Sequence, residues 1–113
     1  MSANRSFSTS MAQDPFESVV RVSGDLDMSV TDELWAAIAN LLDDDSRLVL
    51  DIEDVTFMDS TGLNAIVRAH RACDRFTVRS PSAAVQRLFD VSGVGRLIAV
   101  EPKPIAPERS EPR

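Results

Sequence analysis

The sequence of 113 residues predicts one small α/β domain in which strands alternate with helices around a single core. Three observations support this prediction. Apolar runs rich in β-branched residues alternate with segments whose apolar residues recur at helical spacing. The composition is 43% hydrophobic and 27% charged, which can support a folded core. Strands that alternate with helices require crossovers, so the economical architecture is a small sheet with helices packed against it.

The first quarter of the chain is expected to hold one strand, with at most a weak edge strand before it. Residues Ser6–Ala12 form at most a weak edge strand in this prediction. A stronger strand begins at Phe16, where β-branched residues suit a half-buried sheet, and it should end at Gly24 because glycine interrupts strands. The segment Gly24–Asp27 is therefore predicted to be a loop.

A helix should follow this loop. Either Ser29 or Thr31 can serve as its N-cap, and Asp32 and Glu33 then occupy a first turn in which the helix dipole favours negative charge. The expected apolar face consists of Leu34, Ile38, Leu41 and Leu42. The acidic run Asp43–Asp45 is expected to end the helix.

The middle of the chain predicts a buried strand and a second helix. The nearly continuous apolar run Leu48–Ile52 indicates a strand well inside the sheet. Asp54 should begin a short turn, and Val55–Met58 then returns the chain to an apolar environment. At Asp59–Gly62 the period changes from strand-like to helical. The apolar-face residues of this helix are Leu63, Ile66, Val67 and His70.

The last part of the domain adds a strand and a helix. Phe76–Val78 is predicted to be the strand. Pro81 and Ser82 should open the helix, and Ser92–Gly93 should close it. Its expected apolar residues are Val85, Leu88 and Phe89. Leu97–Val100 is a short final apolar segment, predicted as either strand or helix.

Composition divides the chain into one domain and two ends. Residues 1–15 are rich in Ser, Ala and Asn and are expected to be weakly ordered, with the possible edge strand among them, whereas residues 16–101 should form the domain. Four of the six prolines lie in residues 102–113, which hold little apolar material to offset the entropy of ordering. We expect this tail to be disordered.

Charge narrows the range of partners. Twelve Lys and Arg against eighteen Asp and Glu give a formal net charge of −6, so nucleic acid is not expected as a direct partner, since its binding depends on basic groups. The segment Asp25–Asp59 holds eleven acidic residues and one basic residue, whereas Ser60–Val100 holds six Arg and two acidic residues. These segments form either ordinary solvated faces or a docking surface of mixed sign.

Targeting signals are not apparent. No apolar run is long enough for a transmembrane helix, and the first residues lead into no apolar signal-peptide core. The one Cys, Cys73, cannot form an internal disulfide. A cytoplasmic protein without a membrane contact is therefore expected.

The sequence offers little for catalysis. It has one His, no Gly-rich phosphate loop and no His or Cys pair at metal-ligand spacing, so we expect no metal, no cofactor and no enzymatic activity. His70 should be a core-edge residue without a catalytic role. Cys73 is most simply a small buried hydrophobe, with a thiol redox switch as the alternative. Asp25 and Asp27 have the chemistry for general acid–base work or cation binding but lack supporting ligands at a recognisable spacing.

The acids near strand ends suggest a rival interpretation. Asp51, Asp54 and Asp59 are similar to the acidic cluster of a phospho-accepting receiver domain. The strand order and the lysine that such domains use are missing, because the only Lys is Lys103 in the tail. The receiver interpretation is therefore not favoured.

The segment Asp59–Gly62 is the strongest candidate for a functional site. It joins an apolar strand to an amphipathic helix, so Ser60 should stand at a helix N-terminus, where backbone N–H groups lack partners and negative charge is favoured. A phosphate on Ser60 would add about −1.5 to −2 charges where the helix tolerates them. The simpler interpretation is that Asp59 or Ser60 is only an N-cap.

Three segments in the same order as in a known family distinguish these interpretations. Val55–Leu63 resembles the phosphorylation segment of bacterial anti-sigma factor antagonists, the small STAS-domain proteins. Val22–Asp27 resembles their first loop, and Ser80–Gly93 resembles their third helix and its close. The similarity covers Phe16 to Val100.

The resemblance implies a STAS-type α/β domain, with a mixed sheet and helices mainly on one face, and a partner-switching function. Unphosphorylated antagonists of this family bind an anti-sigma factor that is itself a serine kinase, phosphorylation ends the binding, and a serine phosphatase reverses it. Ser60 would be the phosphoacceptor, with Thr61 as the alternative. The implied partner-binding residues are Asp25, Asp27, Asp59, Ser60, Thr61 and Gly62.

Some features depart from the family pattern. The connection Cys73–Arg75 is short and lacks the usual glycine-containing turn, so the end of the second helix is left open. The family also leaves a second function open, because STAS domains serve as accessory subunits of membrane lipid or anion transporters. A weak nucleotide hydrolase is a third hypothesis, which the missing phosphate loop and general base disfavour.

Overall fold

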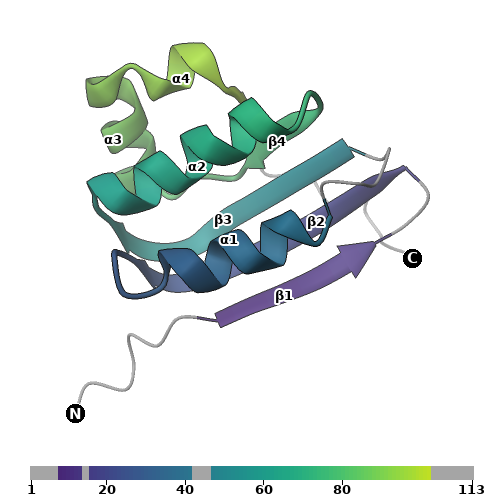
Figure 1. Ribbon diagram of the computed structural model, residues 1–113. Helices are drawn as coiled ribbons and strands as arrows, with labels where there is room; N and C mark the ends of the chain where they lie inside the picture. The colour runs from purple at the N-terminus through teal and green to yellow at the C-terminus, as the bar shows by residue number, and fades with distance from the viewer. Residues whose placement is uncertain (1–7, 14–15, 42–46, 103–113) are drawn as a thin grey trace, which may run out of the picture.

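The computed structural model describes residues 8–13, 16–41 and 47–102 (Figure 1). In chain order, the elements found there are β1 (Ser8–Gln13), β2 (Glu17–Leu26), α1 (Thr31–Ala39), β3 (Arg47–Met58), α2 (Ser60–Ala72), β4 (Phe76–Arg79), α3 (Ala83–Ser92), α4 (Val94–Leu97) and β5 (Ala99–Glu101). Strands and helices alternate after β2, as the sequence predicts.

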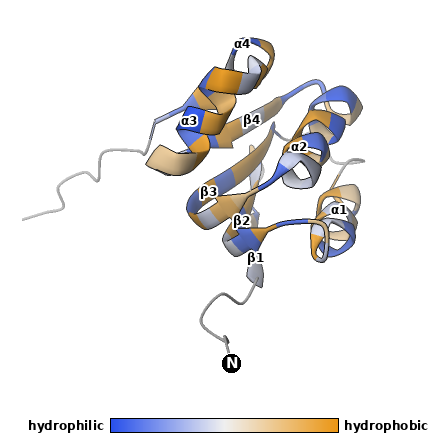
Figure 2. Cartoon of the chain, turned by 90° about the vertical axis from the view of Figure 1, so that its left-hand side faces the viewer, coloured by the Kyte–Doolittle hydropathy of each residue, from blue (hydrophilic) through white to orange (hydrophobic). Residues whose placement is uncertain are grey.

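The sheet is mixed and has the strand order β1-β2-β3-β4-β5. The β1–β2 pair is antiparallel, and the other three pairs are parallel. Helices α1 and α2 lie side by side against one face, and α3 and α4 lie toward the β4 end (Figures 1 and 2). The expected fold class, a mixed sheet with helices packed mainly on one face, is confirmed.

The core lies between the sheet and the helices because alternate residues of the strands point to this side. Leu48, Leu50 and Ile52 of β3 are at most 2% exposed. The helices contribute apolar side chains to the same cluster. Those of α1, α2 and α3 are Leu34, Ile38, Ala65, Ile66, Ala69, Val85 and Phe89.

The opposite face of the sheet carries a ring of four charged side chains, which we call the ionic ring. Its members are Glu17 of β2, Arg47 of β3, Arg79 of β4 and Glu101 of β5. Arg47 lies 3.1 Å from Glu17 and 3.2 Å from Glu101, and Arg79 lies 3.4 Å from Glu17 and 2.6 Å from Glu101. Val49, on the same face of β3 as Arg47, is 0% exposed and does not belong to the core cluster under the helices.

Two predicted turns are wrong because the parallel pairing of β2 and β3 continues through them. Gly24–Asp27 was expected to be a loop, but β2 runs to Leu26, which pairs with Met58 and is buried. The register shifts near Gly24, whose φ of 92° suits glycine, and these irregularities keep the strand paired. Asp54 likewise lies inside β3 rather than in a turn.

The first helix differs from its prediction at both ends. Its N-cap is Val30, not Ser29 or Thr31. The Ser29 side chain donates instead to Asp27, which forms a local turn before the helix. The helix ends at Ala39, and Leu41 is buried beyond it. Leu42 and Asp43–Asp45 lie outside the described residues.

The second half of the domain follows the prediction closely. The α3 helix has Ser82 as its N-cap and Gly93, at φ 84°, as its C-cap. The final apolar segment, Leu97–Val100, contains the last residue of α4 and the first two residues of β5. The α2 helix presents Gly62, Ala65, Ile66 and Ala69 to the core, whereas Leu63, Val67 and His70 are half-buried at its margin. Small side chains face the sheet because the helix lies close to it.

Candidate functional site

The candidate site lies where β2 and β3 end side by side. Leu26 pairs with Met58, and the backbone N–H of Asp59 donates to the Leu26 carbonyl at 3.4 Å. Because parallel strands end at the same edge of a sheet, the residues that follow β2 and those that follow β3 meet there. Asp27 and Asp59 are the first residues after the two strands.

Asp59 is the N-cap of α2. Its Oδ1 accepts hydrogen bonds from the backbone N–H groups of Thr61 at 2.9 Å and Gly62 at 3.2 Å, and from the Thr61 hydroxyl. The Thr61 hydroxyl, together with these N–H groups, holds the pKa of Asp59 below its usual range. The carboxylate is therefore charged at neutral pH.

Ser60 is the first residue of α2 and is exposed. Among the described residues, its side chain has no hydrogen-bond partner, whereas the neighbouring Thr61 hydroxyl is held by Asp59. The two candidate hydroxyls therefore differ in their contacts. The Ser60 hydroxyl can rotate freely into solvent, whereas the Thr61 hydroxyl is held by its hydrogen bond to the N-cap residue Asp59.

Gly62 permits the close contact between α2 and the end of β2. A Cβ at this position would lie 2.5 Å from the Leu26 carbonyl oxygen and 3.0 Å from Met58 Cγ. Backbone cannot give way as the end of a flexible side chain does, so a larger residue would push the start of α2 away from β2. Gly62 therefore sets the position of Ser60 relative to the end of β2.

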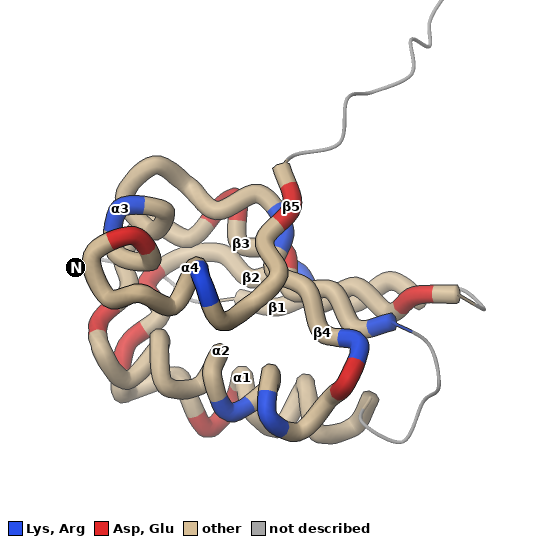
Figure 3. Tube along the Cα trace, turned by 90° about the horizontal axis from the view of Figure 1, so that it is seen from above, with Lys and Arg blue, Asp and Glu red and all other residues tan. Residues whose placement is uncertain are grey.

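Asp25 and Asp27 lie at the same edge of the sheet as Ser60. Asp25 accepts a hydrogen bond from the Thr56 hydroxyl at 3.0 Å, and Asp27 accepts from the Ser29 backbone N–H at 2.9 Å. The structure thus brings all six sequence-predicted site residues to one end of the molecule. Figure 3 shows acidic residues gathered toward this end and basic residues farther along α2.

Two exposed apolar side chains at this edge were not predicted from the sequence. Phe57 is 45% exposed and Met28 is 74% exposed. The pairing passes from Gly24–Val55 to Asp25–Phe57, so Thr56 is an extra residue on β3. This bulge turns Phe57 outward. Simple alternation would place Phe57 on the same side as the buried Val55, so no signal in the sequence could have found it.

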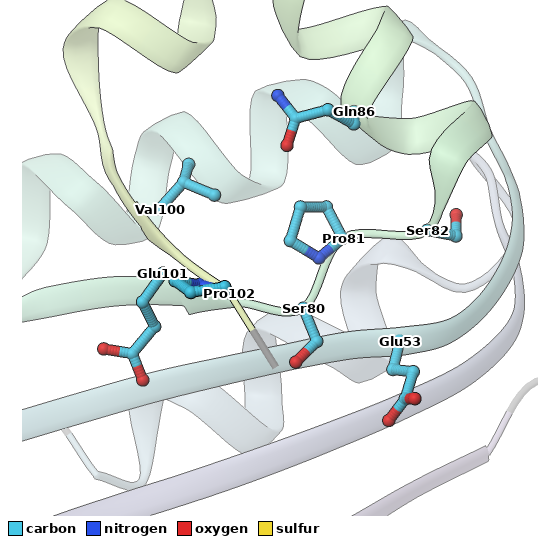
Figure 4. Close-up of a pocket in the computed structure, with 8 residues that line it drawn as sticks. All are labelled: Glu53, Ser80, Pro81, Ser82, Gln86, Val100, Glu101 and Pro102. Carbon is cyan, nitrogen blue, oxygen red and sulfur yellow. The ribbon is translucent and has the colours of Figure 1, made fainter. Parts of the chain in front are cut away.

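The described residues also form pockets away from the Ser60 edge. A pocket of about 630 Å³ lies beside the ends of β4 and β5 (Figure 4). Its lining residues are Glu53, Ser80, Pro81, Ser82, Gln86, Val100, Glu101 and Pro102. Ser80 has a φ of 59° and a buried hydroxyl without a partner in the described part of the chain. Glu101 belongs to the ionic ring and Ser82 caps α3, so part of this lining serves the fold.

The remaining sequence-predicted candidates lie apart from the Ser60 edge. Cys73 is half-buried and follows α2, packed against the core, and His70 is half-buried in the last turn of that helix. In residues 8–13, 16–41 and 47–102, no group of three His, Cys, Asp or Glu side chains has a metal-binding arrangement. Within the same ranges, no helix is both long and apolar enough to span a membrane.

Comparison with known proteins identifies relatives over most of the chain. A family model described as "Mlab, STAS domain" matches residues 9–99. The anti-sigma-B factor antagonist of Staphylococcus aureus (strain NCTC 8325 / PS 47) is 31% identical over 93 residues, which cover 78% of this chain and 85% of that protein.

Solved structures show the same fold. An anti-sigma factor antagonist from Mycobacterium paratuberculosis superposes with a TM-score of 0.80 at 28% identity, covering 89% of this chain and 90% of that one. The Bacillus cell fate determinant SpoIIAA in its phosphorylated form superposes with a TM-score of 0.63 at 23% identity, covering 84% and 90%. The latter likeness concerns the fold alone.

Proposed function

The chain belongs to the STAS domain family, and we propose that it is an anti-sigma factor antagonist that binds an anti-sigma factor serine kinase in the cytoplasm until Ser60 is phosphorylated. The observation that carries the proposal is the exposed Ser60 hydroxyl at the N-terminus of α2, beside Asp59. The names of the relatives in Staphylococcus and Mycobacterium support the antagonist function.

The proposed modification is a phosphoryl transfer from ATP. The Ser60 oxygen forms a bond to the γ-phosphorus, the bond from that phosphorus to the β,γ-bridging oxygen breaks, ADP leaves, and the hydroxyl proton passes to a base of the kinase or to water. Ser60 is favoured over Thr61 because the Thr61 hydroxyl donates to Asp59. A serine phosphatase would hydrolyse the phosphoserine and restore the hydroxyl.

The phosphate changes binding without changing the fold. The Ser60 side chain is exposed, which leaves room for a phosphate, and a helix N-terminus tolerates an anion. Asp59 already occupies the N–H groups of Thr61 and Gly62, so the added charge of about −1.5 to −2 faces solvent or a docked partner.

The surface around Ser60 has the composition of a docking site. The exposed apolar side chains of Phe57 and Met28 can insert into a partner, and the carboxylates of Asp25, Asp27 and Asp59 select a basic surface around them. Such a contact removes water from the edge. A phosphate buried within it would be costly to desolvate, which ends the binding.

The first test is direct phosphorylation. Incubation with the cognate anti-sigma kinase and ATP, followed by mass spectrometry, is expected to place one phosphate on Ser60. Ser60→Ala should abolish labelling, and Thr61→Val should retain it. Full labelling of the Ser60→Ala protein at another residue would overturn the assignment.

The second test separates the switch from a structural role of Ser60. Ser60→Asp should weaken kinase binding roughly tenfold or more, because it places a like charge in the interface, and should leave the melting temperature nearly unchanged. Ala83→Asp is the matched control, since Ala83 is the exposed first residue of α3. Equal losses of affinity in both variants, or a large loss of stability in Ser60→Asp, would contradict the proposal.

A further inference from the structure

A small pocket lies between α1 and α2, beside the first turn of α2. It has a volume of about 130 Å³, and both helices, which pack against each other, contribute to its walls. Its lining residues are Thr31, Asp32, Trp35, Thr61, Asn64, Ala65 and Arg68. Thr61 directly follows Ser60 and is also part of this lining. The pocket is therefore continuous with the edge that carries Ser60.

Arg68 lies over the ring of Trp35 in this pocket. Its Cζ is 4.0 Å from the centre of the ring, a cation–π contact that joins the two helices and orients the guanidinium. Arg68 is exposed, and within the part of the chain that the structure describes it forms no hydrogen bond or ion pair, although Asp32 lines the same pocket. An oriented guanidinium whose N–H donors are unused is suited to bind a carboxylate.

Arg68 lies close enough to Ser60 for one partner to cover both. The two residues are eight positions apart on α2, which corresponds to about 12 Å along the helix axis. A specific interface covers about 800 Å² of each partner, which corresponds to a disc of about 16 Å radius. Thr61 and Arg68 are two helical turns apart and lie on the same face of α2. An interface of ordinary size around Ser60 therefore extends to Arg68.

We propose that the anti-sigma factor kinase extends from the Ser60 edge onto this pocket and places an acidic side chain against Arg68. This inference rests on the function proposed for Ser60. The carboxylates of the Ser60 edge select basic groups on the kinase, whereas Arg68 selects an acidic group about 12 Å away. Opposite charges at two separate points favour one orientation of the bound kinase.

The charge pattern of the sequence agrees with a contact of mixed sign. The segment Asp25–Asp59 is acidic and Ser60–Val100 is basic. Figure 3 shows the acidic residues toward the Ser60 end and basic residues farther along α2. A surface of one sign would accept many basic proteins, whereas a second charge of opposite sign disfavours partners that lack the acidic group. Arg68 is therefore a specificity-determining residue and takes no part in the phosphoryl transfer.

Charge reversal at Arg68 tests the contact. The probe is the kinase that labels Ser60, titrated onto the unphosphorylated protein. Arg68→Glu is expected to weaken binding roughly tenfold or more, because it brings like charges together, and the loss should shrink as NaCl is added. Arg68→Lys should keep most of the affinity, since it keeps the charge. Arg96→Glu is the matched control with little loss expected, because Arg96 is also an exposed arginine but lies on α4.

The outcomes separate this contact from the function proposed for Ser60. At saturating kinase, Arg68→Glu should still be phosphorylated on Ser60, and its melting temperature shows that it is folded. Equal losses of affinity in Arg68→Glu and Arg96→Glu, or no loss in either, would overturn the contact at Arg68 and leave Ser60 as the phosphoacceptor. If the unmodified protein neither binds the kinase nor is labelled on Ser60, both proposals are wrong.

Trp35 gives a second measurement because it is the only Trp of the chain. In protein labelled with 5-fluorotryptophan, the single fluorine resonance is expected to shift when unlabelled kinase is added, since atoms of the kinase would then lie beside the Trp35 ring. A purely structural role of the Trp35–Arg68 contact would leave that resonance where it is. An unshifted resonance at a kinase concentration that saturates binding would contradict the inference.

Discussion

The two faces of the sheet carry different kinds of contact. Leu50 and Val49, neighbours on β3, are both 0% exposed, but Leu50 lies under the helices and Val49 lies on the face of the ionic ring. Apolar packing under the helices is non-directional and does not depend on charge. The ionic ring depends on geometry, pH and ionic strength. The central strand β3 therefore has buried side chains on both faces of the sheet.

The ionic ring also connects strands of the sheet directly to one another, which the helices do not do. Its four members come from four different strands, and two arginines each contact both glutamates. Glu101 lies on the three-residue strand β5, which has little packing surface of its own. Ion pairing thus holds the weakest edge of the sheet, whereas apolar packing holds its centre.

The largest expected effect lies on the helix side. Phe89→Ala should destabilise the protein by about 3 to 5 kcal/mol, because this fully buried ring is the largest side chain that α3 contributes to the core. Denaturant unfolding followed by circular dichroism measures it. The exposed neighbour Val91→Ala is the control, with almost no change expected. A loss below about 1 kcal/mol would mean that α3 does not share the main core.

The spacing between the helix layer and the sheet is tested at Gly62. Gly62→Ala should cost about 1 to 3 kcal/mol, since the new Cβ would lie 2.5 Å from a backbone oxygen of β2. Gly95→Ala is the control, because its Cβ would lie 3.8 Å from the nearest atom. Thermal unfolding compares the two variants. Equal melting temperatures would show that α2 can move away from β2 at no cost.

The ionic ring is expected to contribute less. Glu101→Gln should lower stability by about 1 to 2 kcal/mol, because both arginines then share only Glu17. The difference from the unmodified protein should shrink in concentrated NaCl. Glu33→Gln, at an exposed acid of α1, serves as the control. A loss that does not respond to salt would point to packing rather than charge.

The smallest expected effect is a pH dependence of the stability that comes from the ionic ring. Burial raises the pKa of Glu101, but hydrogen bonds from Arg79 and Arg47 and their charges outweigh it and lower the pKa. A lowered folded-state pKa gives stability that is present above the unfolded value of about 4.3 and is lost as pH falls through the folded value. Melting temperatures from pH 7 down to pH 3 should fall more steeply for the unmodified protein than for Glu101→Gln. Parallel curves would contradict this role.

Much of the candidate site could be predicted from the sequence because its chemistry is local. The change of period at Asp59–Gly62 marks a helix start, and the structure has Asp59 as the cap and Ser60 as the first helical residue. The two hydroxyls could not be distinguished in this way. Only the hydrogen bond from Thr61 to Asp59 separates them.

The sequence alone determined the order of strands and helices and the start and end of α3, since these depend on periodicity and capping among adjacent residues. Only the tertiary structure decided which contacts form between segments that are distant in the sequence. Pairing with β3 extended β2 to Leu26, the bulge at Thr56 turned Phe57 outward, and four strands brought the ionic ring together. Strand register and ion pairing between remote residues depend on the three-dimensional path of the chain, and no local pattern records that path.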